Sequence, residues 1–158
     1  MSINQFIVIQ DTREQKPLEF DSPYIEKVRI NKLDTGDYTI EGMENILTIE
    51  RKGSLVEFYR NATQTRFEDE LIRMQAYKYR FLVLEFSLSE VLAIPYSLGL
   101  SAKQREMCKV SPKYIMSKIS EIQVDYGVNV VFAETREIVT DVITNIMRRV
   151  YELQKPRN

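Results

Sequence analysis

Short runs of apolar residues alternate with longer stretches of mixed apolar and polar residues along this chain. The short runs are rich in β-branched residues and predict strands at residues 4–10, 24–33, 37–41, 46–52, 80–86 and 128–133. The second run is also compatible with a helix that leads into a strand. Residues 42–45, Gly-Met-Glu-Asn, predict a hairpin turn between the third and fourth runs.

Helical spacing of the apolar residues begins after residue 52. It predicts two helices between residues 55 and 74, separated near 61–65, and further helices at 87–99, 111–126 and 135–154. We expect the run at 128–133, which precedes the last helix, to be a buried strand. Five apolar residues share one predicted face of that helix: Ile138, Val142, Ile146, Val150 and Leu153.

Strands that alternate with amphipathic helices predict an α/β protein, a three-layer α/β/α sandwich with a central mixed sheet. The length of 158 residues favours a single domain over 1–158, with 155–158 as a frayed tail. No apolar run approaches the ~20 residues of a membrane span, and no secretory signal precedes the first strand. We therefore expect a soluble, intracellular protein.

The residue types that the chain lacks narrow its chemistry. It contains no histidine and a single cysteine, Cys108. This composition excludes Ser-His-Asp and Cys-His catalysis, histidine-metal nuclease motifs and ordinary structural zinc sites. Acid–base or metal chemistry must use Asp, Glu, Lys, Tyr and water. The net charge of −1 counts modestly against tight autonomous DNA binding, although acidic metal ligands would dilute a basic surface.

Two carboxylates and a lysine stand at a spacing that a hairpin would bring together. Glu50 and Lys52 point to the same face of their strand, whereas Arg51 points to the other. A turn near residues 43–44 would place Asp37 almost opposite Glu50, about 5 Å away at Cβ. Such carboxylates raise each other's pKa unless a cation such as Mg²⁺ or Mn²⁺ binds them. Lys52 would then stabilise the attacking hydroxide or the charge growing on a phosphate.

A surface hairpin with weak ion pairs would explain the last triplet alone, but three motifs occur together. They are Asp11-Thr12-Arg13-Glu14, Gly36-Asp37-Tyr38 and Glu50-Arg51-Lys52. In order and spacing they resemble the XPF-type nuclease domain, a branch of the restriction-endonuclease-like PD-(D/E)XK superfamily. The resemblance implies a Mg²⁺- or Mn²⁺-dependent endonuclease that hydrolyses phosphodiester bonds in branched, flap or single-strand/double-strand junction DNA. Such enzymes act in DNA repair, recombination or replication.

The resemblance also implies which residues form the catalytic centre. Asp37 and Glu50 would bind the metal, with Asp11 as a further ligand, and Lys52 would be the catalytic lysine. Asp11 would assist together with Glu14, through metal-bound water or hydrogen bonds.

Two arginines and one further glutamate complete this set. Arg13 and Arg51 would balance charge and orient the acids. The family usually has an aspartate four residues after the lysine, and this chain has Val56 there. Glu57 can fill that role only if the chain carries a one-residue insertion after the lysine.

Basic and amide side chains that follow the motifs are candidates for DNA contact. Four of them are expected near the cut site: Arg60, Gln64, Arg66 and Arg73. A solvated helix face, neutralised by neighbouring acids, is the alternative. A second basic stretch over 103–118 could guide DNA, and a plain surface is the simpler account of it. Tyr38, next to the acid of its motif, is expected in the core.

The resemblance leaves substrate recognition and assembly open. Helix-hairpin-helix repeats, which cellular members commonly add after the nuclease domain, are missing here, so a partner would supply junction recognition. Family members often dimerise through their C-terminal region, and we expect a homodimer or a heteromeric partner through the C-terminal helices. The short chain fits a phage, viral or archaeal source. The alternatives are a non-catalytic DNA-binding or scaffold subunit, which would have lost the motif acids, and a restriction-type nuclease.

Overall fold

The computed structural model describes residues 3–155. The strands are β1 (Phe6–Gln10), β2 (Ile25–Ile30), β3 (Tyr38–Ile40), β4 (Leu47–Lys52), β5 (Tyr79–Leu84) and β6 (Asn129–Phe132). The helices are α1 (Leu55–Ala62), α2 (Thr65–Met74), α3 (Leu88–Leu92), the 3₁₀ helix η1 (Tyr96–Leu98), α4 (Ala102–Glu106), α5 (Pro112–Asp125) and α6 (Arg136–Gln154). Helix α4 was not predicted from the sequence pattern. A capping box of Ser101 and Gln104 begins it.

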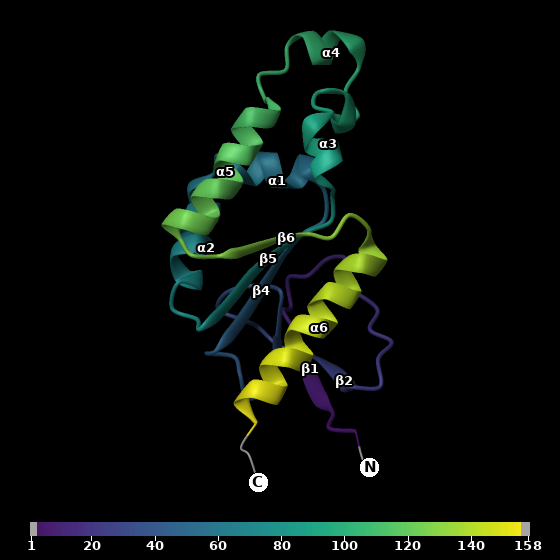
Figure 1. The fold of residues 1–158 in the computed structure, drawn as a ribbon, viewed down its shortest axis with the longest axis vertical. Coiled ribbons are helices and arrows are strands. Elements are labelled where there is room, and N and C mark those ends of the chain that lie inside the picture. Colours follow the sequence, from purple (N-terminus) through teal and green to yellow (C-terminus); the bar gives the residue numbers. More distant parts are fainter. Residues whose placement is uncertain (1–2, 156–158) are drawn as a thin grey trace.

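One mixed sheet with the strand order β2-β1-β3-β4-β5-β6 forms the middle layer. Helices cover both of its faces (Figure 1). Side chains of α1, α2, α3 and α5 pack in one buried cluster, and side chains of α6 pack in the other. The predicted α/β/α sandwich is therefore confirmed.

Strand direction brings the motifs to one edge of this sheet. Strand β3 runs antiparallel to β1 and β4, whereas β4, β5 and β6 are parallel to one another. The carboxyl ends of these three parallel strands consequently share one edge. In the β3–β4 pair, Tyr38 is the partner of Ile49. This register places Asp37 across from Glu50, as the predicted hairpin requires.

The central strand β5 is buried on both of its faces. Leu82 and Leu84 belong to the cluster beneath α1, α2 and α5, and Val83 belongs to the cluster beneath α6. This alternation follows from the two-residue period of a strand. A strand covered on both faces reads as a continuous apolar run, which is why the sequence predicted it well.

Gly36 forms the turn that leads into β3. Its φ is +82°, and a Cβ atom at this position would clash with Thr48 Oγ1 and lie 3.0 Å from Ile49 O. Both the left-handed backbone and the close approach of β4 require glycine here. The approach lets Asp37 N donate a hydrogen bond of 2.8 Å to Ile49 O. The glycine therefore fixes the acid that follows it against β4.

The buried face of helix α6 overlaps the predicted face only in part. Its buried residues are Val139, Ile143, Met147 and Val150. Ile138 and Leu153, which were predicted on the buried face, are 42% and 51% exposed. Val150 was predicted correctly, and Val142 and Ile146 are partly buried against the same cluster. The prediction was wrong at Ile138 and Leu153, because spacings of three and four residues fit both sets of apolar side chains. Packing against the sheet selects between them.

Strand β6 is less buried than predicted. It lies at the edge of the sheet, and Phe132 is 36% exposed. Only the flanking Val128 and Ala133 are fully covered. The expectation of a buried strand was wrong because an apolar run does not distinguish an edge strand from a central one.

Residues 88–113 form a projecting lobe between β5 and β6. The lobe contains α3, η1, α4 and the first turn of α5, and Figure 1 shows it rising beyond the sheet on the side away from both termini. No residue of α4 is buried. Within residues 3–155, no helix is both long and apolar enough to cross a membrane.

Replacement of Gly36 by alanine should destabilise the protein through backbone strain and through the clash with β4. Strain alone costs about 1–3 kcal/mol, and about 2–4 °C in Tm follows from each kcal/mol at this chain length. Gly42 is a matched control, because its φ is +84° but a Cβ added there would meet no neighbouring side chain or strand within 4 Å. Thermal denaturation should show a larger loss for Gly36→Ala than for Gly42→Ala. Equal losses would contradict the packing argument.

Candidate active site

Asp37 is held in place by the backbone of β4 on both sides of Glu50. Its N–H donates to Ile49 O at 2.8 Å, and its carboxylate accepts from the N–H of Arg51 at 2.8 Å. Its carboxylate is therefore oriented by main-chain atoms alone. This anchoring presents the acid to the cavity opposite Glu50 with little freedom to move.

Glu50 and Lys52 form a buried ion pair on one face of β4. Lys52 Nζ lies 3.0 Å from Glu50 Oε1, and both side chains are more than nine-tenths buried. The ammonium also lies 4.9 Å from the ring centroid of Phe67, on α2. This cation–π contact restrains the long side chain from a second direction. The lysine head is thus fixed beside the acids.

The cluster contains more carboxyl groups than cations can neutralise without cost. Burial raises the pKa of Asp37 to about 7, and the charges of Glu14 and Glu70 add to the effect. Burial, followed by the charge of Asp37, also raises the pKa of Glu50 well above its ordinary value. A contact with the carboxyl group of Glu70 contributes to that rise. Without a metal, Asp37 therefore keeps its proton up to about pH 7.

Lys52 stays charged in this surrounding. Burial alone would lower the pKa of Lys52, but the charges of Glu50 and Glu70 and the hydrogen bond to Glu50 raise it above the ordinary value. A lysine with a raised pKa is a poor general base at neutral pH. Its chemical use is electrostatic, as a positive charge beside an anion.

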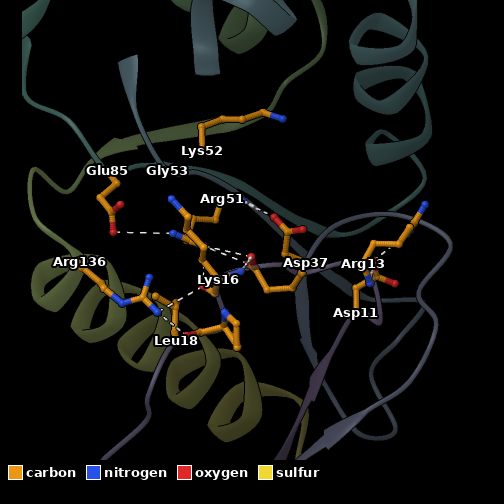
Figure 2. A network of polar contacts seen from close by, with 12 residues as sticks. Asp11, Arg13, Lys16, Leu18, Asp37, Arg51, Lys52, Gly53, Glu85 and Arg136 are labelled. Carbon is orange, nitrogen blue, oxygen red and sulfur yellow. Dashed lines mark hydrogen bonds and ion pairs between the residues drawn. The ribbon is translucent and has the colours of Figure 1, made fainter. Parts of the chain in front are cut away.

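The side chain of Arg51 points to the opposite face and links β4 to the loop after β1 and to the residue that follows β5. Its guanidinium donates to Glu14 at 3.0 and 3.3 Å and to Lys16 O at 2.8 Å. Glu85, which follows β5, lies 3.7 Å from Arg51 Nη1. Figure 2 shows Arg51 between these groups, with Lys52 extending away from it. Arg136 of α6 donates to the carbonyls of Lys16 and Pro17, so the loop after β1 is tied to both β4 and α6.

Asp11 of the first motif makes its hydrogen bonds to nearby residues outside the strands. Asp11 accepts from Arg13 Nε at 2.7 Å and from the N–H of Leu33 at 2.8 Å. Burial would raise the pKa of Asp11, but these hydrogen bonds outweigh it and hold the pKa below its ordinary value. Figure 2 places Asp11 and Arg13 apart from the Arg51 network. The predicted role of Asp11 as a metal ligand stays a prediction.

The carboxylate of Glu57 is bound at the start of α1. Its carboxylate accepts from the N–H of Gly53 at 2.7 Å, and its N–H donates to Ser54 Oγ at 3.1 Å. The side chain is exposed at the start of α1. These contacts close the first turn of the helix. Its predicted catalytic role stays a prediction.

A cavity of about 690 Å³ opens over the motifs. Residues of all three motifs line it, as do Glu57, Arg66 and Arg73. Gln64 instead lines a neighbouring cavity between α2 and α5, and Arg60 lines neither cavity. The exposed Arg66 and Arg73 are therefore the predicted DNA contacts that stand closest to the acids.

Three residues of this region were missed in the sequence. Glu70 lies on α2 one turn from Arg66 and Arg73, and this spacing of four and three residues could have revealed a shared face. Phe67 fits the apolar spacing of that helix, and this spacing gives no sign of its contact with the lysine. Glu85 follows a central parallel strand, at the edge where the motifs end, and that place was the available signal.

The oxygen ligands at this site are of the type that a hard divalent cation prefers. Asp37 and Glu50 offer carboxylate oxygens from adjacent strands, and Mg²⁺ commonly uses one or two protein carboxylates while keeping several waters. In residues 3–155, no three acidic or cysteine side chains are gathered closely enough to enclose a metal. A cation would therefore be bound by few protein ligands and be open to water and substrate on one side.

The fold of this chain is the restriction-endonuclease-like α/β/α sandwich. The chain belongs to the ERCC4 domain family, whose model matches residues 10–146. That family is one of DNA nucleases, and the resemblance to the XPF-type nuclease domain is confirmed.

Two solved structures share the fold. One is XPF from Aeropyrum pernix, with a TM-score of 0.66 and 17% identity over 96% of this chain and 65% of that one. The other is XPF from Aeropyrum pernix in complex with DNA, with a TM-score of 0.69 and 19% identity over 97% of this chain and 68% of that one. The chain thus spans about two thirds of each. No curated protein sequence matches it.

The raised pKa of Asp37 predicts how the stability of the metal-free protein depends on pH. The folded chain holds this proton up to about pH 7, whereas the unfolded chain releases it near the ordinary value of 3.8. Stability should therefore fall as pH rises between these values. Asp37→Asn keeps the hydrogen-bond acceptor and removes the charge. It should melt roughly 3–6 °C above wild type at pH 8 in EDTA, equivalent to about 1.5 kcal/mol, and show a smaller gap at pH 5.

Asp125→Asn, at the exposed end of α5, is the control and should follow the wild type at both pH values. A gap between Asp37→Asn and wild type that does not change with pH would contradict the assignment of the raised pKa to Asp37.

Proposed function

We propose that this domain is a Mg²⁺- or Mn²⁺-dependent endodeoxyribonuclease that hydrolyses phosphodiester bonds with water as the nucleophile. The observation that carries the proposal is the pair of carboxyl groups on facing strands, half-buried Asp37 and buried Glu50, with the charged Lys52 fixed beside them. Such a pair is unfavourable as bare anions and suits a divalent cation. We propose DNA as the substrate because the chain belongs to a family of DNA nucleases.

Each part of the centre has a distinct role in the proposed reaction. Asp37 and Glu50 would hold the cation. When bound, the cation neutralises the two acids, lowers the pKa of water and stabilises charge on the phosphate. Lys52, held between Glu50 and the ring of Phe67, would stabilise the hydroxide or the negative charge that grows on the phosphate. Arg66 would contact the DNA backbone at the mouth of the cavity.

Arg51 acts at a distance from the reacting atoms in this proposal. Its N–H donates to the Asp37 carboxylate, and its guanidinium binds Glu14 and lies near Glu85. It would keep β4 and the loop after β1 in register and orient the metal-binding acid. Arg51, Glu14 and Glu85 are therefore proposed as positioning residues.

The substrate that we propose is branched, flap or single-strand/double-strand junction DNA, encountered in repair, recombination or replication. The support is the likeness to XPF from Aeropyrum pernix, one of whose structures is a complex with DNA. A second subunit, bound through α5 and α6, is part of the proposal. Val124, Ile138 and Leu153 expose apolar side chains on these helices.

Two other functions are less well supported. A non-catalytic scaffold subunit would have no use for buried acids paired with a lysine, and Asp37, Glu50 and Lys52 are all present. A restriction-type nuclease would use the same centre and cut intact duplex at fixed sequences. Comparison of forked, flap and plasmid DNA as substrates separates it from a junction-selective enzyme.

The first test is cleavage of these three substrates by the purified protein with Mg²⁺ or Mn²⁺. Forked or flap DNA should be cut, and EDTA should abolish cleavage. Asp37→Asn should lower the rate at least about 100-fold, because it removes a charge that holds the cation. Asp125→Asn should cut at the wild-type rate. Absence of cleavage of every DNA with both metals, or an unchanged rate for Asp37→Asn, would overturn the proposal.

A second prediction separates Glu50, in the third motif, from Glu57, which lies on the helix that follows it. Glu50→Gln should lose cleavage and should also lose the Mn²⁺-induced rise in Tm, since the buried carboxylate is a proposed ligand. Glu57→Gln should retain both, because a glutamine oxygen can still accept from Gly53 N. Thermal shift with Mn²⁺ and a cleavage time course on forked DNA measure the two properties. Similar losses in both variants would assign Glu57 to the metal site as well.

A further inference from the structure

The projecting lobe rises from the catalytic edge of the sheet. Lys52 is paired with Leu84 on β5, and Glu85 N donates to Lys52 O at 2.8 Å. Helix α3 begins at Leu88, three residues after Glu85, which itself lines the catalytic cavity. DNA that reaches the acids therefore has the base of the lobe beside it. Figure 1 shows the lobe continuing outward from there.

Positive charge is concentrated on this lobe. Residues 101–113 contain four basic side chains, Lys103, Arg105, Lys109 and Lys113, and one acid, Glu106, in a chain whose net charge is −1. The three lysines are exposed. Among the described residues, the ion pairs all lie outside this segment. None of the four cations is therefore within ion-pair distance of a described carboxylate, and they are available to an anionic partner.

An aromatic platform lies next to these cations. Tyr96 is 77% exposed, and the guanidinium of Arg105 lies 5.2 Å from its ring centroid. Arg105 is fixed in turn, because its Nη1 donates to Leu100 O at 3.0 Å. Met107, nearby in sequence on the same lobe, is 73% exposed. An exposed aromatic ring with an adjacent arginine is an arrangement on which unpaired bases stack.

We propose that the lobe binds an unpaired DNA strand that leaves the cleavage site. Lys103, Lys109 and Lys113 contact its phosphates, and Tyr96 with Arg105 stacks against a base. This inference rests on the proposed function and adds to it a surface that selects substrates with single-stranded arms. The unpaired positive charge favours nucleic acid over a protein partner as the occupant, although apolar side chains of α3 are also exposed.

The test uses the full chain in EDTA, so that binding is measured without cleavage. Fluorescence anisotropy compares a forked duplex with unpaired oligothymidine arms and a blunt duplex. Tyr96→Ala should bind forked DNA about 5-fold to 100-fold more weakly than wild type. It should bind the blunt duplex as wild type does. Tyr96→Phe should restore binding, because the ring is kept.

The lysines are tested by the dependence of binding on salt. For Lys103→Ala/Lys109→Ala, the slope of log affinity against log salt on forked DNA should fall by about 1.4, since each lost single-strand phosphate contact removes about 0.7. Lys27→Ala/Lys32→Ala removes two exposed lysines at or near the β2 edge, far along the sheet from the lobe. This control should keep the wild-type slope.

Three results would overturn the inference. The first is wild-type affinity for forked DNA in folded Tyr96→Ala, and the second is an unchanged salt slope in the lysine variant. The third is a self-association that Tyr96→Ala abolishes in sedimentation while DNA binding is unchanged, since the lobe would then be a protein interface. If the wild type cleaves DNA and any of these three results is found, the inference about the lobe fails and the proposed function stands. If wild type neither binds nor cuts any DNA, the proposed function fails together with it.

Discussion

The register between β3 and β4 is the constraint on which the rest of the site depends. Gly36 allows β3 to approach β4 so closely that Asp37 joins the ladder through Ile49 O. The same register sets Asp37 across from Glu50, so two acids from different segments share one partly enclosed space. Burial makes their joint ionisation costly, and the positive groups around them offset part of that cost. A shift of one residue would send the acids to opposite faces.

Because alternate residues of a strand point to opposite faces, the third motif contributes side chains to both faces of β4. Glu50 and Lys52 stay together in a buried pair at the cavity. Arg51, one residue away from each, enters a network with Glu14 and Glu85 on the other side. A buried charge pair contributes little stability after desolvation, but removal of one member leaves the other uncompensated. The pair Glu50–Lys52 at the cavity and the Arg51 network on the other face therefore depend on each other.

The sequence predicted those features of the fold that depend on residues close to one another in the chain. The hairpin, the central strand β5 and the opposite directions of Glu50 and Arg51 all follow from strand period and turn residues. The buried face of α6 and the exposure of β6 did not follow, because they are set by which surface each element meets. Glu70 and Phe67 were missed for the same reason. Their roles arise only when α2 packs over the end of β4.

Pairing of charges, rather than their number, explains how an almost neutral chain can serve an anionic substrate. At the catalytic centre the cations are occupied, since Lys52 is bound to Glu50 and Arg51 to Glu14. These groups cannot attract DNA strongly at long range, because their fields are largely cancelled by adjacent carboxylates. The cations of the segment 101–113 have no such partners among the described residues. In the proposed function, attraction of a polyanion and chemistry on its phosphate would thus fall on different, adjoining surfaces of the molecule, so that the acids of the proposed active site would not prevent DNA binding.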